Sequence, residues 1–297
     1  MSGTILVIGA TGTVGREVVN ELLRAGRQVR AAVTPPSLDA ARHRLAPTVE
    51  VVPFAFERPE TFARAFENAT GVFLMRPPHV SDIKHVMGPA IRYAAEHGRP
   101  HTVVLSVLGA GGNPLVPHHA MERLVRKSGV PYTMLRPSFF MQNLSTQYRD
   151  GIGVRNEIFV PAGRGRTSFI DVRDIAAVAA RVMGHEDHFG KAYALTGAEA
   201  LDYFQVAETF TEVLKRRVDY VSPTSRVFRA RLRAQGVPED FIRVLRGIYF
   251  TARIGLAARV TPASERLLGR PPISLAQFVR DYADEWRQEP ALARTGS

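Results

Sequence analysis

The amino-acid sequence predicts an α/β protein with a doubly wound parallel sheet and a smaller, mainly helical C-terminal portion. Three observations carry this prediction. Short apolar runs alternate with helix-patterned stretches, the runs are uniformly apolar and rich in valine, and a glycine-rich turn joins the first run to the first helix. Strands alternating with helices favour right-handed βαβ units. Uniformly apolar strands are typical of a sheet that is covered on both faces.

Six apolar runs are the predicted strands of this sheet: 4–8, 29–33, 49–52, 72–75, 102–105 and 132–135. The first predicted helix carries Val14, Val18 and Leu22 on one face, and further helical patterns cover 37–45, 60–66, 83–97 and 121–127. An open parallel sheet binds its ligand beyond the carboxyl ends of the strands. We expect those ends near Gly9, Thr34, Pro53, Arg76, Ser106 and Pro137.

Beyond residue 139 the pattern becomes mainly helical. Several glycines indicate loops around a short strand at 158–161, and a helix at 171–183 and a strand at 193–195 follow. Further helices are predicted at 203–214, 238–250 and 273–286. We therefore expect two domains, residues 1–150 and residues 151–297, of which the second covers the substrate cleft and returns segments to the sheet.

Composition narrows the class of protein. The chain has 297 residues, a net charge of +11 and no cysteine, which excludes disulfides, thiol catalysis and cysteine-based metal centres. It shows no signal peptide and no apolar run that could cross a membrane, so a cytoplasmic location without membrane contact is expected. The excess arginines are scattered, so nucleic acid is not expected as a partner. No metal site is expected either, because His185 and His188 lack the spacing of a zinc motif.

The glycine turn is the most informative motif. In Gly9-x-x-Gly12-x-x-Gly15 the first glycine allows a tight turn, the second lets a diphosphate approach the backbone, and the third lets helix and sheet pack closely. The amides that would point at the phosphates belong to Thr11, Gly12, Thr13 and Val14. A turn without a ligand is the alternative, but the position of the motif after the first strand favours dinucleotide binding. Residues 1–150 are thus predicted to form a Rossmann-type NAD(P)-binding domain.

This glycine spacing resembles that of the short-chain dehydrogenases, and further motifs resemble their atypical NmrA-like branch. These motifs are Leu135-Arg136-Pro137 with Phe140-Met141-Gln142-Asn143, the segment 169–176, Tyr193-Ala194-Leu195-Thr196-Gly197, and Gly269-Arg270-Pro271-Pro272 with Phe278. The resemblance extends over nearly the whole chain. It implies one of several functions: NADPH-dependent quinone or dye reduction, reduction of secondary metabolites, or non-enzymatic redox sensing.

The choice of cofactor depends on the end of the second strand. An acidic residue there would bind the ribose hydroxyls of NAD(H), and arginine would suit the 2′-phosphate of NADP(H). The sequence has Thr34 at this point, where the family often has arginine, and nothing acidic before Asp39. Because Arg30, Arg42 and Arg44 are near in sequence, NADP(H) is favoured over NAD(H). Each of these arginines is also compatible with an ordinary solvated charge.

The usual catalytic pair of short-chain dehydrogenases is missing. Alignment on Glu122 places His118 where the family lysine stands and Pro114 where the tyrosine stands, so the ordinary general acid is absent. Ser106 and His118 are the candidate catalytic residues, although His118 fits a structural helix start equally well. Further cofactor contacts are expected from Thr34, Met75, Arg76, Pro77, Ser106, His118, Pro137, Phe139 and Phe140. The expected substrate pocket contains Phe140, Met141, Asn143 and Tyr148.

These residues predict an NADP(H)-dependent reductase of a quinone or another conjugated aromatic ketone, such as a secondary metabolite. Hydride delivery to such a substrate forms a delocalised anion that water can protonate, so no tyrosine acid is needed. The alternative is a non-enzymatic dinucleotide sensor that binds a protein partner, and a cofactor-bound isomerase is a third interpretation. The oligomeric state is open, and a homodimer is compatible with the sequence.

Overall fold

The computed structural model describes residues 3–287, and the chain divides into two compact units. Unit 1 comprises Met1–Pro137, Val172–Leu195 and Ala263–Arg270. Unit 2 comprises Ser138–Asp171, Thr196–Pro262 and Pro271–Ser297. The chain therefore passes from one unit to the other five times.

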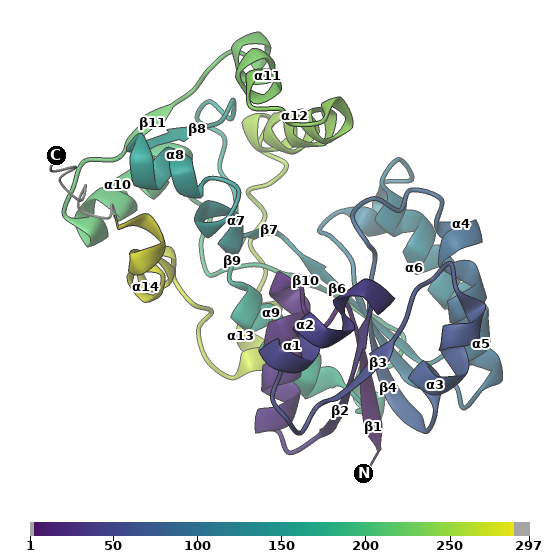
Figure 1. The fold of residues 1–297 in the computed structure, drawn as a ribbon. Coiled ribbons are helices and arrows are strands. Elements are labelled where there is room, and N and C mark those ends of the chain that lie inside the picture. Colours follow the sequence, from purple (N-terminus) through teal and green to yellow (C-terminus); the bar gives the residue numbers. More distant parts are fainter. Residues whose placement is uncertain (1–2, 288–297) are drawn as a thin grey trace, which may run out of the picture. The chain divides into compact units, whose positions relative to one another are not determined.

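A seven-stranded sheet forms the centre of unit 1 (Figure 1). Its order is β10-β6-β5-β4-β1-β2-β3, and every neighbouring pair is parallel. The strands are β1 (Thr4–Ile8), β2 (Gln28–Val33), β3 (Glu50–Pro53), β4 (Ala69–Met75), β5 (His101–Leu105), β6 (Tyr132–Pro137) and β10 (Lys191–Leu195). This arrangement confirms the predicted doubly wound, Rossmann-type sheet.

Helices cover both faces of this sheet. One face carries α1 (Thr13–Arg24), which packs on α9 (Val172–Val182), and α9 in turn contacts α13 (Ala263–Leu268). The other face carries α3 (Phe62–Phe66), α4 (Ile83–Val86), α5 (Gly88–Glu96) and α6 (Pro117–Ser128), as Figure 1 shows. The short helix α2 (Leu38–Arg44) precedes β3. Two helical layers thus bury the apolar strands, which explains why their residues do not alternate in polarity.

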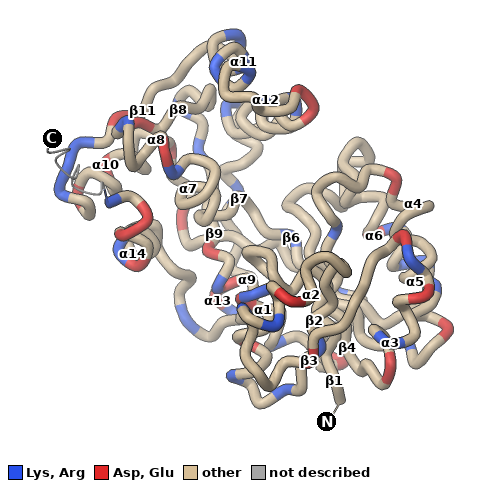
Figure 2. Tube along the Cα trace, viewed as in Figure 1, with Lys and Arg blue, Asp and Glu red and all other residues tan. Residues whose placement is uncertain are grey.

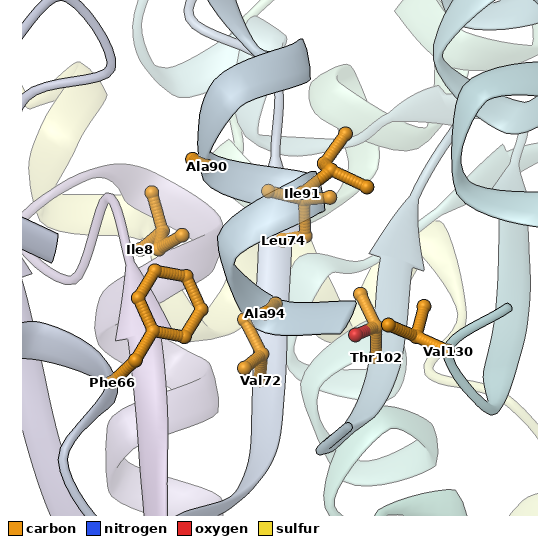
Figure 3. Close-up of a pocket in the computed structure, with 9 residues that line it drawn as sticks. All are labelled: Ile8, Phe66, Val72, Leu74, Ala90, Ile91, Ala94, Thr102 and Val130. Atoms are coloured by element: carbon orange, nitrogen blue, oxygen red, sulfur yellow. The ribbon is translucent and has the colours of Figure 1, made fainter. Parts of the chain in front are cut away.

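A small cavity lies in the core between α5 and the sheet (Figure 3). Its volume is about 10 Å³, roughly what one water molecule needs. Apart from the Thr102 hydroxyl the lining is hydrocarbon: Ile8, Phe66, Val72, Leu74, Ala90, Ile91, Ala94, Thr102 and Val130. A void of this size and polarity is a packing defect of the core and does not serve a ligand.

Two predicted helices are interrupted in the structure. The segment 83–97 forms α4 and α5, because Pro89 stands in the first turn of α5 and cannot continue a helix through its own amide. The segment 273–286 forms α14 (Leu275–Asp281) and a separate 3₁₀ turn at Ala283–Trp286. In contrast α10 (Tyr203–Leu214) has the predicted bounds, because Asp202 and Gln205 form a capping box at its start.

Unit 2 is mainly helical, as predicted, with two short strand pairs. β7 (Phe139–Phe140) pairs with β9 (Phe169–Ile170), and β8 (Glu157–Phe159) pairs with β11 (Asp219–Val221). Its helices are α7 (Gln142–Ser145), α8 (Arg149–Val154), α10, α11 (Ser225–Ala234), α12 (Glu239–Arg253) and α14. The core is rich in aromatic side chains and includes Tyr203, Phe210, Tyr249, Phe278 and Trp286.

The arginines of α11 do not form an open basic face, although Figure 2 shows this helix as strongly basic. Arg229 and Arg233 both pair with Glu239, and Arg231 pairs with Glu157. Local ion pairs therefore neutralise part of the charge that the sequence concentrates here. Within the described range, no helix is long and apolar enough to span a membrane, and no group of three or more histidine or acidic side chains could hold a metal ion.

Candidate functional site

The glycine turn of unit 1 has the geometry that its spacing predicts. Gly9 has φ +75°, and a Cβ atom there would lie 2.6 Å from the sulfur of Met75 at the end of β4. A Cβ atom at Gly15 would overlap the carbonyl oxygen of Gly9. At Gly12 a Cβ atom would meet only that oxygen, at 3.3 Å, so this glycine faces open space. Gly9 and Gly15 are needed for packing, whereas Gly12 leaves room for a ligand.

The start of α1 fits a diphosphate. Gly12 caps the helix without a side-chain hydrogen bond, and the first turn contains no acidic residue. The amides of Thr13 and Val14 have no carbonyl one turn before them, so they are able to donate to an anion. The prediction for Gly12 is wrong, because its amide already donates to the Gly9 carbonyl at 3.0 Å. Thr13 and Gly12 are exposed, and Thr11 is partly exposed. The helix dipole adds a partial positive charge at this end.

The end of β2 offers hydroxyl groups and no free carboxylate. The Thr34 hydroxyl lies 3.0 Å from that of Ser37, and Asp39 is paired with Arg42 at 3.0 Å. The prediction that Arg30 could reach a 2′-phosphate is wrong, because its side chain is buried. Its Nε donates to Glu50 at 2.7 Å and its Nη1 donates to the carbonyl of Ala65 at 3.2 Å.

Arg76 and Pro77 begin the loop after β4. The Nη1 atom of Arg76 donates to the carbonyl oxygens of Pro77, Pro78 and Val80, at 3.0, 2.9 and 2.6 Å. Burial lowers the pKa of Arg76, and its buried Nε has no hydrogen-bond partner among residues 3–287. Arg76 therefore holds the loop in shape and keeps one N–H for a further acceptor.

A buried carboxylate joins three elements next to Ser106. Glu122 on α6, only 1% exposed, accepts from the Ser106 hydroxyl at 2.7 Å. It also accepts from Nε and Nη2 of Arg136 on β6, at 2.8 and 2.6 Å, and from Arg126 at 3.0 Å. Burial acts to raise the pKa of Glu122, but the hydrogen bonds from Arg136 and Ser106 outweigh it, and the pKa is lowered. Ser106 is 1% exposed and its proton is engaged, so this geometry supports a structural anchor and not a donor to substrate.

His118 lies in the first turn of α6, within the electrostatic field of Arg76. Burial lowers the pKa of His118 to about 4, with a further lowering from Arg76 that Glu122 partly offsets. The imidazole is therefore neutral near pH 7 and is not a general acid there. Pro114, at the position of the family tyrosine, is exposed and carries no proton. Unit 1 thus has no substitute for the missing catalytic pair at these two positions.

The remaining predicted residues lie around the chain's first passage into unit 2. Pro137 ends β6 and accepts a hydrogen bond from the Leu108 amide, whereas Phe139 and Phe140 form β7. Met141 is buried, and the Asn143 carbonyl accepts a hydrogen bond from the Tyr148 amide. Phe140 and Asn143 are partly exposed, as is Tyr148. The structure therefore groups the four pocket candidates within nine residues of chain in unit 2, together with the cofactor candidates Phe139 and Phe140. The cofactor candidates from Gly9 to Pro137 lie in unit 1.

Comparisons with known proteins identify the family. The model of the NmrA-like family matches residues 1–253. An NAD(P)H azoreductase of Xenophilus azovorans is 32% identical over 285 residues, which is 94% of this chain and 98% of the relative. The chain belongs to the NmrA-like family.

Solved structures agree with this assignment. The NADPH-dependent quinone oxidoreductase QOR2 of Escherichia coli, complexed with NADPH, has a TM-score of 0.83 at 25% identity, covering 93% of this chain and 99% of that chain. The triphenylmethane reductase of Citrobacter sp., complexed with NADP(H), has a TM-score of 0.83 at 24% identity, covering 94% and 99%, which shows a shared fold. The predicted family is confirmed, and its characterised members among these relatives are NAD(P)H-dependent reductases.

Sequence reasoning missed the roles of Glu122, Arg136 and Tyr249. Glu122 and Arg126 are four residues apart on a helix, which indicates an ion pair but not its burial. The contact with Arg136 depends on the packing of α6 on β6. The Tyr249 contact with Tyr148 joins residues about a hundred positions apart, and no local sequence pattern predicts it.

Proposed function

We propose that the chain is an NADP(H)-dependent reductase of quinones or other conjugated aromatic ketones. The observation that carries this proposal is the turn at Gly9, Gly12 and Gly15, with an open second glycine and a helix start that no side chain caps. The turn at the end of β4, with the free N–H of Arg76, would border the nicotinamide half. Reduction of quinones by a relative of similar length supports the substrate class.

The missing acid is consistent with this substrate class. When bound, the reduced nicotinamide supplies a hydride, which carries two electrons to the substrate. A quinone that accepts a hydride becomes an aromatic anion, which takes its proton from water. With His118 neutral and Pro114 unable to donate, the role of unit 1 is to bind and orient the cofactor.

Preference for NADP(H) rests on charge. The end of β2 presents no free carboxylate to repel a 2′-phosphate, because Arg42 neutralises Asp39. The hydroxyls of Thr34 and Ser37 and the exposed Arg44 are the groups that we assign to the phosphate. Arg30 is excluded from this set by its burial.

Calorimetric titration of the protein with NADPH, NADP⁺, NADH and NAD⁺ tests the cofactor proposal. We expect the tightest binding for NADPH, followed by quinone-dependent oxidation of NADPH measured at its absorbance band. Equal affinity for the reduced and oxidised forms, together with no turnover on quinones, would favour the sensor interpretation. Reduction of simple aldehydes but of no quinone would refute the substrate class.

A further inference from the structure

Three tyrosines of unit 2 lie ring against ring and end in one partly exposed phenol. The ring centroids of Tyr148 and Tyr249 are 6.3 Å apart, and those of Tyr249 and Tyr203 are 6.0 Å apart. Tyr249 and Tyr203 are buried, with 0% and 1% exposed, whereas Tyr148 is partly exposed. A rigid, buried pair of rings therefore supports the side chain of Tyr148.

The hydrogen bonds that the Tyr148 hydroxyl accepts leave it able only to donate a further one. Tyr249 donates its hydroxyl hydrogen to the Tyr148 oxygen, and Gln147 Nε2 donates to the same oxygen at 2.9 Å. A phenol oxygen accepts about two hydrogen bonds and donates one. Both acceptor positions are thus used, and no acceptor for the Tyr148 hydrogen lies within residues 3–287. The phenol is left as a hydrogen-bond donor.

The surroundings of this donor are aromatic. The ring of Phe139 lies 6.4 Å and that of Phe228 5.7 Å from the Tyr249 ring, measured between centroids. An oriented polar group among aromatic side chains is typical of a site that recognises a flat ligand with one hydrogen-bonding atom.

We propose that Tyr148 donates a hydrogen bond to the reducible oxygen of the substrate, and that Tyr249 is its positioning residue. This inference rests on the proposed function. Hydride addition to a quinone carries two electrons and forms one new bond to hydrogen, and the negative charge that develops rests on the quinone oxygens. The Tyr148 hydrogen bond stabilises that charge, and water supplies the proton that completes the hydroquinone.

Tyr148 acts in this step as a donor that keeps its proton. Burial raises the pKa of Tyr148, and the hydrogen bonds from Tyr249 and Gln147 oppose this only in part. The phenol therefore stays protonated throughout the neutral range. Its contribution to quinone reduction is expected to be constant between about pH 6 and pH 9, because the group does not titrate there.

The test compares two hydride acceptors in Tyr148→Phe, which keeps the ring and removes the hydroxyl. The first is a p-benzoquinone. The second is a cationic triarylmethane dye, in which the hydride forms a C–H bond at the central carbon and discharges the cation without an oxygen or a proton. We expect kcat/KM for the quinone to fall about 100-fold, the lower end of the loss that follows removal of one oriented donor to a developing oxyanion. For the dye we expect a change of less than about twofold, because no donor is needed.

Two further variants separate the roles. Tyr249→Phe should lower quinone reduction by a smaller factor and leave dye reduction unchanged, because Tyr148 keeps its hydroxyl but loses a partner that orients it. Tyr220→Phe is the matched control, since the Tyr220 hydroxyl donates to the Val160 carbonyl in the same unit. It should leave the ratio of the two rates unchanged. NADPH affinity and circular dichroism report whether each variant folds.

A binding measurement keeps this inference separate from the proposed function. Quinone affinity is measured without cofactor, from the quenching of Trp286 fluorescence in unit 2. Loss of one hydrogen bond predicts about three- to tenfold weaker binding in Tyr148→Phe. If the wild type turns over neither acceptor, the proposed function is wrong, and this affinity ratio alone decides the role of Tyr148. Equal affinities, or equal losses on quinone and dye, would overturn the inference.

Discussion

Replacing Glu122 by glutamine removes a buried negative charge that accepts hydrogen bonds from the end of β5, from β6 and from α6 itself. Three donors point at this carboxylate: the Ser106 hydroxyl and the guanidinium groups of Arg136 and Arg126. Glutamine keeps the shape but offers one oxygen and an NH₂ group, so at least one guanidinium N–H would face another donor. The variant therefore leaves the charge of Arg136 without compensation.

The loss in free energy of unfolding depends on how far Arg136 and Arg126 are exposed to water. Removing one member of a buried ion pair costs about 3–5 kcal/mol. Glu122 is 1% exposed, but Arg136 and Arg126 are 21% and 39% exposed, and water can solvate them partly when the carboxylate is gone. We therefore expect the lower end, about 3 kcal/mol. With an m-value of about 3 kcal/mol per M in urea, the unfolding midpoint falls by about 1 M.

Urea unfolding of the wild type and Glu122→Gln, followed by circular dichroism, measures this loss, and Glu60→Gln is the control on an exposed position. Because the folded-state pKa of Glu122 is lowered, its contribution is present above the ordinary pKa of 4.5 and is lost as the pH falls below it. The difference between the two proteins should therefore shrink in acid. A loss below about 1 kcal/mol at pH 7 that does not change with pH would refute this reasoning.

Three other outcomes are expected. Gly12→Ala should fold but bind NADPH at least tenfold more weakly in calorimetry, whereas Gly15→Ala should lose thermal stability first, because its Cβ overlaps the Gly9 carbonyl. Burial lowers the pKa of His101 from 6.5 to about 4, so the unfolded chain takes up this proton first as the pH falls. Between pH 6.5 and pH 4 the free energy of unfolding should therefore fall by about 3 kcal/mol. In urea titrations His101→Asn should lack this pH-dependent loss. Ser106→Ala should cost about 1 kcal/mol and leave kcat nearly unchanged; a fall in kcat of a hundredfold would restore Ser106 as a donor to substrate.

The fold was predictable because its signals are local. Each strand of the sheet is a short apolar run that two helical layers bury, and the capping residues Asp202 and Gln205 define the start of α10 in the sequence itself. Pro89 is a local signal for the break between α4 and α5, but the helical periodicity of 83–97 predicts one continuous helix. Local patterns of this kind do not depend on the rest of the chain.

The candidate site was predictable only where its functional residues lie close together in the sequence. The turn from Gly9 to Gly15 could be interpreted from spacing, since its three glycines act within one loop. The burial of Arg30 could not, because it depends on Glu50 and on carbonyls of a distant segment. The same holds for Tyr148, whose orientation depends on Tyr249 in a helix that follows about a hundred residues later.

The repeated passage of the chain between the two units has a consequence for biosynthesis. α1 packs against α9 and α9 against α13, so unit 1 is incomplete until residue 270 has been made. At roughly 5–20 residues per second, the first 137 residues wait about 7–27 s for their last segment. The face of α1 that packs on α9 lacks this partner until residue 182 has been made, about 2–9 s after residue 137, and α9 lacks α13 for the rest of that time. A fragment that ends at residue 137 or 150 would remain in that unfinished state permanently.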